Sequence, residues 1–133
     1  MKKYFSVEEA NELLPWLERE ITYLQELKTE FQTKLKELHT YKHEHKSQAM
    51  TSEYQDAVFK MECGLEFMEV EAKNRIQALY DRGIQVKQID YGLVDFPSVV
   101  NGEEVLLCWR LGESAITHYH GINEGFAGRK ELF

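Results

Sequence analysis

The sequence predicts an α+β protein in which a long antiparallel helical hairpin, with a short kinked N-terminal helix, packs on a small C-terminal antiparallel β-meander. Apolar residues recur every three or four positions over about residues 6–83, which is helical spacing. Residues 84–133 instead alternate apolar and polar side chains between turn glycines, which is strand spacing. A chain of 133 residues is about one domain long, so we expect residues 1–133 to form a single domain.

The composition is that of a globular protein rather than a disordered one, with 43% hydrophobic and 29% charged residues. A net charge of −7 without a basic stripe argues against nonspecific binding to nucleic acid or to anionic membranes. No segment approaches the roughly 18 apolar residues of a membrane span, and the N-terminus lacks the apolar run of a signal peptide. We therefore expect a cytoplasmic protein in which Cys63 and Cys108 are reduced.

The first helix is predicted to begin at Val7, because Ser6 and Glu9 form a capping box. Pro15 has no amide to donate to the carbonyl of Asn11 and its ring crowds that carbonyl, which predicts a kink or a break into a short and a long helix. One apolar seam continues past the proline regardless. Its members are Val7, Ala10, Leu14, Leu17, Ile21, Leu24, Phe31, Leu35 and Leu38, with Lys28 as the one charged member.

The start of the second helix is indicated by Thr51 and Ser52, the latter with Gln55 three residues on, and the helix is predicted to end at Gly83, a suitable left-handed cap. Its own apolar seam consists of Tyr54, Val58, Met61, Leu65, Met68, Ala72 and Leu79. The two seams match in length, so the helices should form an antiparallel hairpin. Two helices alone leave much of each apolar face in water. We therefore expect a homodimer in which two hairpins form a four-helix bundle through the long helices.

The connection between the helices, about residues 39–50, contains His39, His43 and His45. Metal binding is one interpretation. A solvated turn whose histidines happen to cluster is favoured, because the segment offers few carboxylates and no rigid support.

The strand register follows from Asn101-Gly102, a type I′ turn signal that pairs Val100 with Glu103 and sets Asp95 opposite Cys108. Residues 84–90 precede this hairpin as an edge strand. One face of the hairpin is apolar and should lie on the helices: Val94, Phe96, Val105, Leu107 and Trp109. The other face carries Leu93, Asp95, Val99, Leu106, Cys108 and Arg110, with Asp95 and Arg110 as diagonal neighbours.

A third strand is expected from Ala115 to His120. If its loop has three residues, Cys108 pairs with His118 and Leu106 with His120, and a loop one residue longer or shorter reverses the faces. In either register His118 and His120 share a face, with Cα atoms about 6.6 Å apart.

That spacing suits two ligands of zinc or another divalent ion, with a carboxylate to complete the site. The predicted metal ligands are His118, His120, Glu113 and Asp95. A structural role for one histidine, hydrogen-bonded to a carboxylate or carbonyl, is the favoured alternative, and a metal-free acid–base histidine is a third.

The Gly-rich segment at residues 125–129 could present backbone amides and a guanidinium to a phosphate or carboxylate. Its candidate residues are Gly125, Phe126, Gly128 and Arg129. In the alternative, Phe126 fills the core while Arg129 pairs with Glu113, Glu124 or Asp95 to fasten the tail.

Several motifs together resemble a known family. CWRLGE at 108–113, Tyr119-His120, GFAGR at 125–129, GLVDFP at 92–97 and FSVEEANELLPWL at 5–17 resemble the prokaryotic family called domain of unknown function 2203. The resemblance implies a small cytoplasmic protein and supplies no substrate. His118 stands where such proteins are expected to carry an aromatic residue, which argues against a metal site that needs both histidines. The residues that the resemblance singles out are Asp95, Trp109, Arg110, Glu113, His120, Gly125, Phe126, Gly128 and Arg129.

Two functions of different classes follow. The first is a homo-oligomeric binding module with a polar pocket for a small anionic ligand on its C-terminal sheet. The second is a divalent-metal-dependent hydrolase that uses the His-x-His pair and a carboxylate to activate water. Cys108 in the middle of a strand is typical of an inert small hydrophobe rather than a nucleophile. Whether the protein is an enzyme stays open, and the residues of the predicted pocket are Asp95, Arg110, Glu113, His120 and Arg129.

Overall fold

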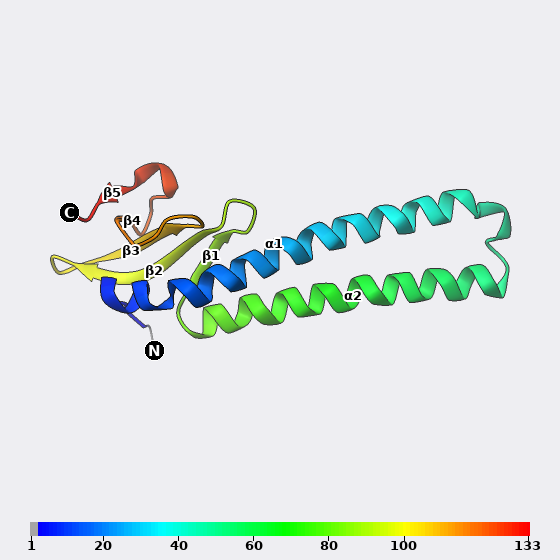
Figure 1. The fold of residues 1–133 in the computed structure, drawn as a ribbon, viewed down its shortest axis with the longest axis horizontal. Helices are drawn as coiled ribbons and strands as arrows, with labels where there is room; N and C mark the ends of the chain where they lie inside the picture. The colour runs from blue at the N-terminus through cyan, green and yellow to red at the C-terminus, as the bar shows by residue number, and fades with distance from the viewer. Residues whose placement is uncertain (1–2) are drawn as a thin grey trace. The chain divides into compact units, whose positions relative to one another are not determined.

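The computed structural model describes residues 3–133 and confirms the α+β fold: two long helices followed by a five-stranded antiparallel sheet (Figure 1). By its contacts the chain divides into two compact units. One, which we call the sheet unit, combines the chain up to Tyr23 with residues 75–133. The other, the helical unit, is residues 24–74. That the protein is a single domain stays a prediction.

Helix α1, Val7–Glu44, begins at the predicted capping box. The Ser6 hydroxyl accepts a hydrogen bond from the Glu9 amide at 3.0 Å, and the Glu9 carboxylate accepts one from the Ser6 amide at 3.1 Å. The Ser6 amide, followed by the Ser6 hydroxyl, lowers the pKa of Glu9. The capping prediction is therefore confirmed.

Pro15 lies inside α1 without ending it, so the predicted alternative of a break into a short and a long helix is wrong. A proline in a helix interior costs about 3 kcal/mol through the missing hydrogen bond and the ring clash. Leu14 and Leu17 on either side of it are almost fully buried. Burial of such side chains contributes about 1.5–3 kcal/mol each, which is enough to keep the helix continuous.

The helical unit has its own small core, made of Leu38 from α1 and of Val58 and Leu65 from α2. Partly buried residues pack against these three: Phe31, Leu35, Tyr41, Tyr54 and Met61. The seam predicted from the spacing of the apolar residues therefore forms the contact between the helices in this unit.

The connection after α1 is shorter than predicted, because the helix runs to Glu44 and takes in His39 and His43. A single 3-10 turn, Lys46–Gln48, then leads to the second helix. The ring of His45 stacks on Tyr41 with centroids 4.1 Å apart, and its Nδ1 lies 3.0 Å from the Tyr41 carbonyl. His45 thus packs on its own helix.

Helix α2, Ser52–Asp81, ends at the predicted glycine. Gly83 has φ +88°, its amide donates to the Tyr80 carbonyl, and the Ile84 amide donates to the Leu79 carbonyl. This is the paired hydrogen-bond pattern of a Schellman cap, which needs the left-handed conformation that glycine adopts without strain.

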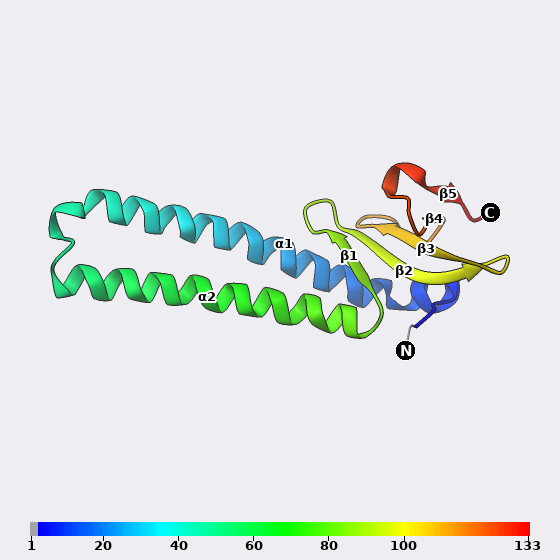
Figure 2. The same ribbon diagram turned by 180° about the vertical axis from the view of Figure 1, so that it is seen from behind.

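The five strands follow one another in space in chain order, β1 to β5 (Figure 2). Their bounds are β1 Gln85–Gln88, β2 Leu93–Val100, β3 Glu103–Arg110, β4 His118–Gly121 and β5 Lys130–Glu131. The predicted register is confirmed, with Asp95 opposite Cys108 and Cys108 opposite His118. The predicted three-residue loop is wrong, because residues 111–117 connect β3 to β4, and the strand begins at His118 rather than at Ala115. Strand β5 was not predicted, because two residues carry no recognisable alternation.

The apolar face of β2 and β3 is confirmed as buried: Val94, Phe96, Val105, Leu107 and Trp109. Within the sheet unit it meets the N-terminal segment and the first part of α1. Phe5 packs edge-on against Phe96 with centroids 5.3 Å apart. The Asn11 side chain accepts a hydrogen bond from the Ile116 amide at 2.7 Å, which ties α1 to the loop before β4.

Among residues 3–133, neither helix carries the long apolar stretch needed to cross a bilayer.

Candidate functional site

The second face of the sheet, opposite the helix, buries a cluster of polar groups. Asp95 on β2, Cys108 on β3 and His120 on β4 are each 2% exposed. Asp95 and Cys108 are directly paired across the strands, while His120 pairs with Leu106 and so lies diagonally from Asp95. Three adjacent strands thus bring an acid, a thiol and an imidazole together; we call these three residues the buried triad.

The hydrogen bonds of His120 fix where its protons lie. Nδ1 is 2.9 Å from the Gly121 carbonyl oxygen, which can only accept, so Nδ1 carries a hydrogen. Nε2 is 3.0 Å from Asp95 Oδ2. Two lone pairs would repel at that distance, so one proton lies between this nitrogen and this oxygen. A ligand that binds between His120 Nε2 and Asp95 Oδ2 would therefore have to displace this proton.

Cys108 completes the triad as a neutral thiol. Burial, and next the negative charge of Asp95, raise the pKa of the Cys108 thiol to about 12. A thiolate, the form that attacks electrophiles, is therefore scarce at neutral pH. This agrees with the expectation that Cys108 is not a nucleophile on its own.

A second charged pair lies beside the triad. Arg129 Nη2 donates to both carboxylate oxygens of Glu113, at 2.8 and 2.9 Å, and lies 3.3 Å from the Cys108 carbonyl. The Glu113 carboxylate also accepts the Arg110 amide at 2.7 Å. In this structure, Arg129 and Glu113 are engaged with each other, as in the predicted alternative in which the arginine fastens the tail.

Arg110 does not join these groups. Its side chain is exposed, and its guanidinium lies 5.7 Å from the ring of Tyr91 and 6.0 Å from that of Phe126. The diagonal neighbour predicted for it, Asp95, pairs with His120 instead. An arginine at the end of a strand keeps its charge in water at little cost, whereas burial beside Asp95 would require desolvation.

The predicted anion loop contains a 3-10 turn, Phe126–Gly128, and two of the amides of residues 125–129 donate within the segment itself. The Gly128 amide donates to the Gly125 carbonyl and the Arg129 amide to the Phe126 carbonyl. Phe126 is 40% exposed, so it does not fill the core as the alternative expected.

The carboxylate nearest this turn is the chain's own Glu124. It accepts the Gly121 amide at 2.8 Å, and that hydrogen bond lowers the pKa of Glu124. A Cβ on Gly128 would meet Glu124 Oε2 at 2.8 Å. The glycine is therefore explained by the close approach of an internal carboxylate.

His118 lies outside the triad. It is partly exposed, and its Nδ1 is 2.8 Å from the Thr117 hydroxyl. Of the four predicted metal ligands, the structure places only His120 and Asp95 in direct contact. Sequence reasoning passed over Cys108 as a partner in the site, although the predicted register already placed it opposite Asp95.

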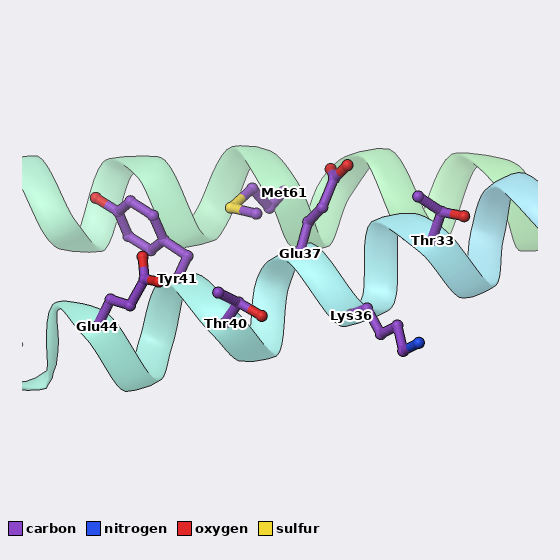
Figure 3. Close-up of a pocket in the computed structure, with 7 residues that line it drawn as sticks. All are labelled: Thr33, Lys36, Glu37, Thr40, Tyr41, Glu44 and Met61. Atoms are coloured by element: carbon purple, nitrogen blue, oxygen red, sulfur yellow. The ribbon is translucent and has the colours of Figure 1, made fainter.

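The helical unit contains an open depression of about 590 Å³ (Figure 3). Lys36 points away from Met61 and from α2, and the other polar groups do not converge on one point (Figure 3). Without convergent polar groups the depression lacks the features of a ligand site. Its lining residues are Thr33, Lys36, Glu37, Thr40, Tyr41, Glu44 and Met61.

The fold and the site define the class: an α+β protein with a helical hairpin and a C-terminal antiparallel sheet that buries an Asp–His–Cys triad. A family model described as an uncharacterized conserved protein, DUF2203, matches residues 3–132. The chain belongs to that family. No match was found among curated proteins or among solved structures.

Proposed function

We propose that this protein is a homodimeric binding module that pairs with a second copy of itself through the outer face of α2. The observation that carries the proposal is a stripe on α2 formed by Phe59, Cys63, Phe67 and Val70. These residues are spaced by four, four and three positions, so they share one side of the helix. That side lies about 145° around the helix from Val58 and Leu65, which face the core of the helical unit.

The large apolar side chains of the stripe are strongly exposed. Phe59 is 67% exposed, Phe67 77% and Val70 53%. Single exposed apolar residues are ordinary, but a row of them on one helix face is typical of an interaction surface.

The exposed phenylalanines would supply much of the free energy that association requires. At about 200 Å² for each phenylalanine, the two exposed fractions leave roughly 290 Å² of ring surface in water per copy. Burying it on two copies would contribute about 14 kcal/mol at about 25 cal/mol/Å². Association costs about 4–15 kcal/mol, and Val70 and Cys63 add to the gain.

The charges beside the stripe favour an antiparallel pair of α2 helices. The stripe is centred between residues 64 and 65, and a two-fold axis there sets Lys60 about 3 Å along the helix axis from the level of the partner's Glu71. The reciprocal pair forms by symmetry. Opposite charges beside an apolar seam help to set orientation, as they do in coiled coils.

The hydrolase alternative is less well supported. Only two of its four residues, His120 and Asp95, lie in contact, and both are buried. Hydrolysis at a metal needs a position open to substrate and water.

Sedimentation velocity tests the proposal. We expect the wild-type protein to be a dimer at micromolar concentration and Phe67→Glu to be a monomer with an unchanged helical spectrum. Phe133→Glu is the matched control, since Phe133 is 90% exposed and lies in the sheet unit, and it should stay dimeric. A monomeric wild type at about 100 µM, or equal weakening by both variants, contradicts the proposal.

Cysteine cross-linking gives a second test. The antiparallel pairing sets the two Cys63 residues about 4.5 Å apart along the helix axis, at 1.5 Å rise per residue. A short bis-maleimide should therefore trap a covalent dimer in a Cys108→Ser background. The control is a variant whose single cysteine is at position 133. If the same fraction of that variant is cross-linked, the result argues against this interface.

A further inference from the structure

We infer that the buried triad, Asp95, Cys108 and His120, is a binding site for a thiophilic divalent cation of the zinc class. This inference goes beyond the proposed dimer and does not depend on it. It rests on the geometry, hydrogen bonding and charge of the three side chains.

The geometry fits one ion. One donor atom from each residue, a carboxylate oxygen, the Cys108 Sγ and an imidazole nitrogen, lies within 4.8 Å of the other two. Ligands held about 2.0–2.3 Å from a tetrahedral zinc are separated by about 3.3–3.8 Å from one another. Small side-chain rotations therefore suffice to place all three donors around a shared centre, and three ligands leave one position for a further small ligand.

The imidazole is already oriented as a metal ligand. A histidine that binds a metal through one ring nitrogen nearly always donates the other N–H to a carbonyl, a carboxylate or water. Here Nδ1–H donates to the Gly121 carbonyl, so Nε2 is the nitrogen directed at Asp95 and the thiol. The backbone of β4 thus fixes the ring before any ion arrives.

The protons and charges balance. Without a metal, the thiol keeps its hydrogen and one proton is shared between His120 Nε2 and Asp95 Oδ2. Binding one divalent ion releases both protons, after which a carboxylate and a thiolate neutralise the ion beside a neutral imidazole. The adjacent Arg129–Glu113 pair adds no net charge.

The donor set also selects the ion. Thiolate and imidazole favour zinc, cobalt and copper, whereas magnesium and calcium prefer all-oxygen sites. All three ligands lie in the middle of strands in the sheet rather than on a loop, and each is buried. An ion bound there would link the three neighbouring strands β2, β3 and β4 and would keep one position for a further small ligand.

Cobalt(II) titration of the protein, purified without a histidine tag and treated with a chelator, tests the inference. We expect one ion per chain, visible bands of tetrahedral cobalt and a near-ultraviolet band from thiolate-to-cobalt charge transfer. Zinc should displace the cobalt and raise the melting temperature, while magnesium should do neither. A wild-type protein with no charge-transfer band overturns the inference.

Matched pairs of variants locate the site, because the chain contains two cysteines and supplies His118 beside His120. Cys108→Ser and His120→Gln should each weaken cobalt binding by more than about tenfold, the smallest loss that removal of even an outer-shell partner causes. Cys63→Ser and His118→Gln should leave binding unchanged. If Cys108→Ser fails to fold, a charge-transfer band that survives Cys63→Ser still assigns the thiolate to Cys108, and a band lost in Cys63→Ser overturns the site.

Discussion

Replacing Asp95 with alanine is expected to lower the free energy of unfolding by about 3–5 kcal/mol, the usual cost of removing one partner from a buried pair. The side chains of His120 and Asp95 are 2% and 3% exposed, and the atoms that join them are 3.0 Å apart. The variant would leave His120 Nε2 buried without its partner. Domains are stable by only about 5–15 kcal/mol, so the loss removes a large share of the total.

Urea unfolding followed by circular dichroism, in the presence of a chelator, measures this loss. Asp56→Ala is the control, because Asp56 is an exposed aspartate on α2 and its removal should change stability by no more than about 0.5 kcal/mol. A double-mutant cycle with His120→Ala should show a coupling energy above about 1 kcal/mol. If Asp95→Ala loses less than about 1 kcal/mol, or if the two substitutions are additive, the pair does not form as described.

Three further predictions follow from the packing. In the Phe67→Glu variant, which is expected to be monomeric, a thiol reagent at neutral pH should label Cys63 quickly and Cys108 only on unfolding, because burial raises the pKa of Cys108 to about 12. Two fast thiols in the mass spectrum would contradict this. Gly92→Ala should lower the melting temperature, because φ at this position is +63° and the added Cβ would lie 2.4 Å from the Leu111 side chain. Gly64→Ala should raise the melting temperature through helix propensity, because the added Cβ meets nothing within 4 Å. Equal shifts of the melting temperature in the two variants would refute that reasoning. Arg129→Ala should cost about 1.5–3 kcal/mol in urea unfolding and speed carboxypeptidase digestion of the tail, and unchanged digestion would show that the arginine does not fasten it.

The fold was largely predictable because its signals are local. The capping box, the left-handed glycine after α2 and the Asn101-Gly102 turn each act over a few residues, and each is confirmed. The turn then propagates: once Val100 faces Glu103, every pair along β2 and β3 follows from the two-residue period of a strand. Pro15 is the exception. The local rule that proline ends a helix fails there, because tertiary packing buries Leu14 and Leu17 and keeps the helix continuous.

The site was less predictable because it depends on side-chain directions. The register places His118 and His120 on a common face, but it does not reveal that Nε2 of His120 reaches diagonally to Asp95 while His118 turns to Thr117. The position of the tail is equally hidden, since a two-residue strand, β5, carries no pattern. Cys108 could have been predicted as a site residue, because the predicted register already placed its ionisable side chain opposite Asp95.

The pair of hydrogen bonds made by His120 underlies both the buried triad and the inferred cation site. A long-range ¹H–¹⁵N correlation spectrum of the metal-free, imidazole-labelled protein measures it directly. We predict that Nδ1 of His120 carries a slowly exchanging hydrogen. A spectrum in which Nδ1 is unprotonated and only Nε2 bears hydrogen, or in which both ring hydrogens of His120 exchange as fast as those of the partly exposed His118, would contradict the account.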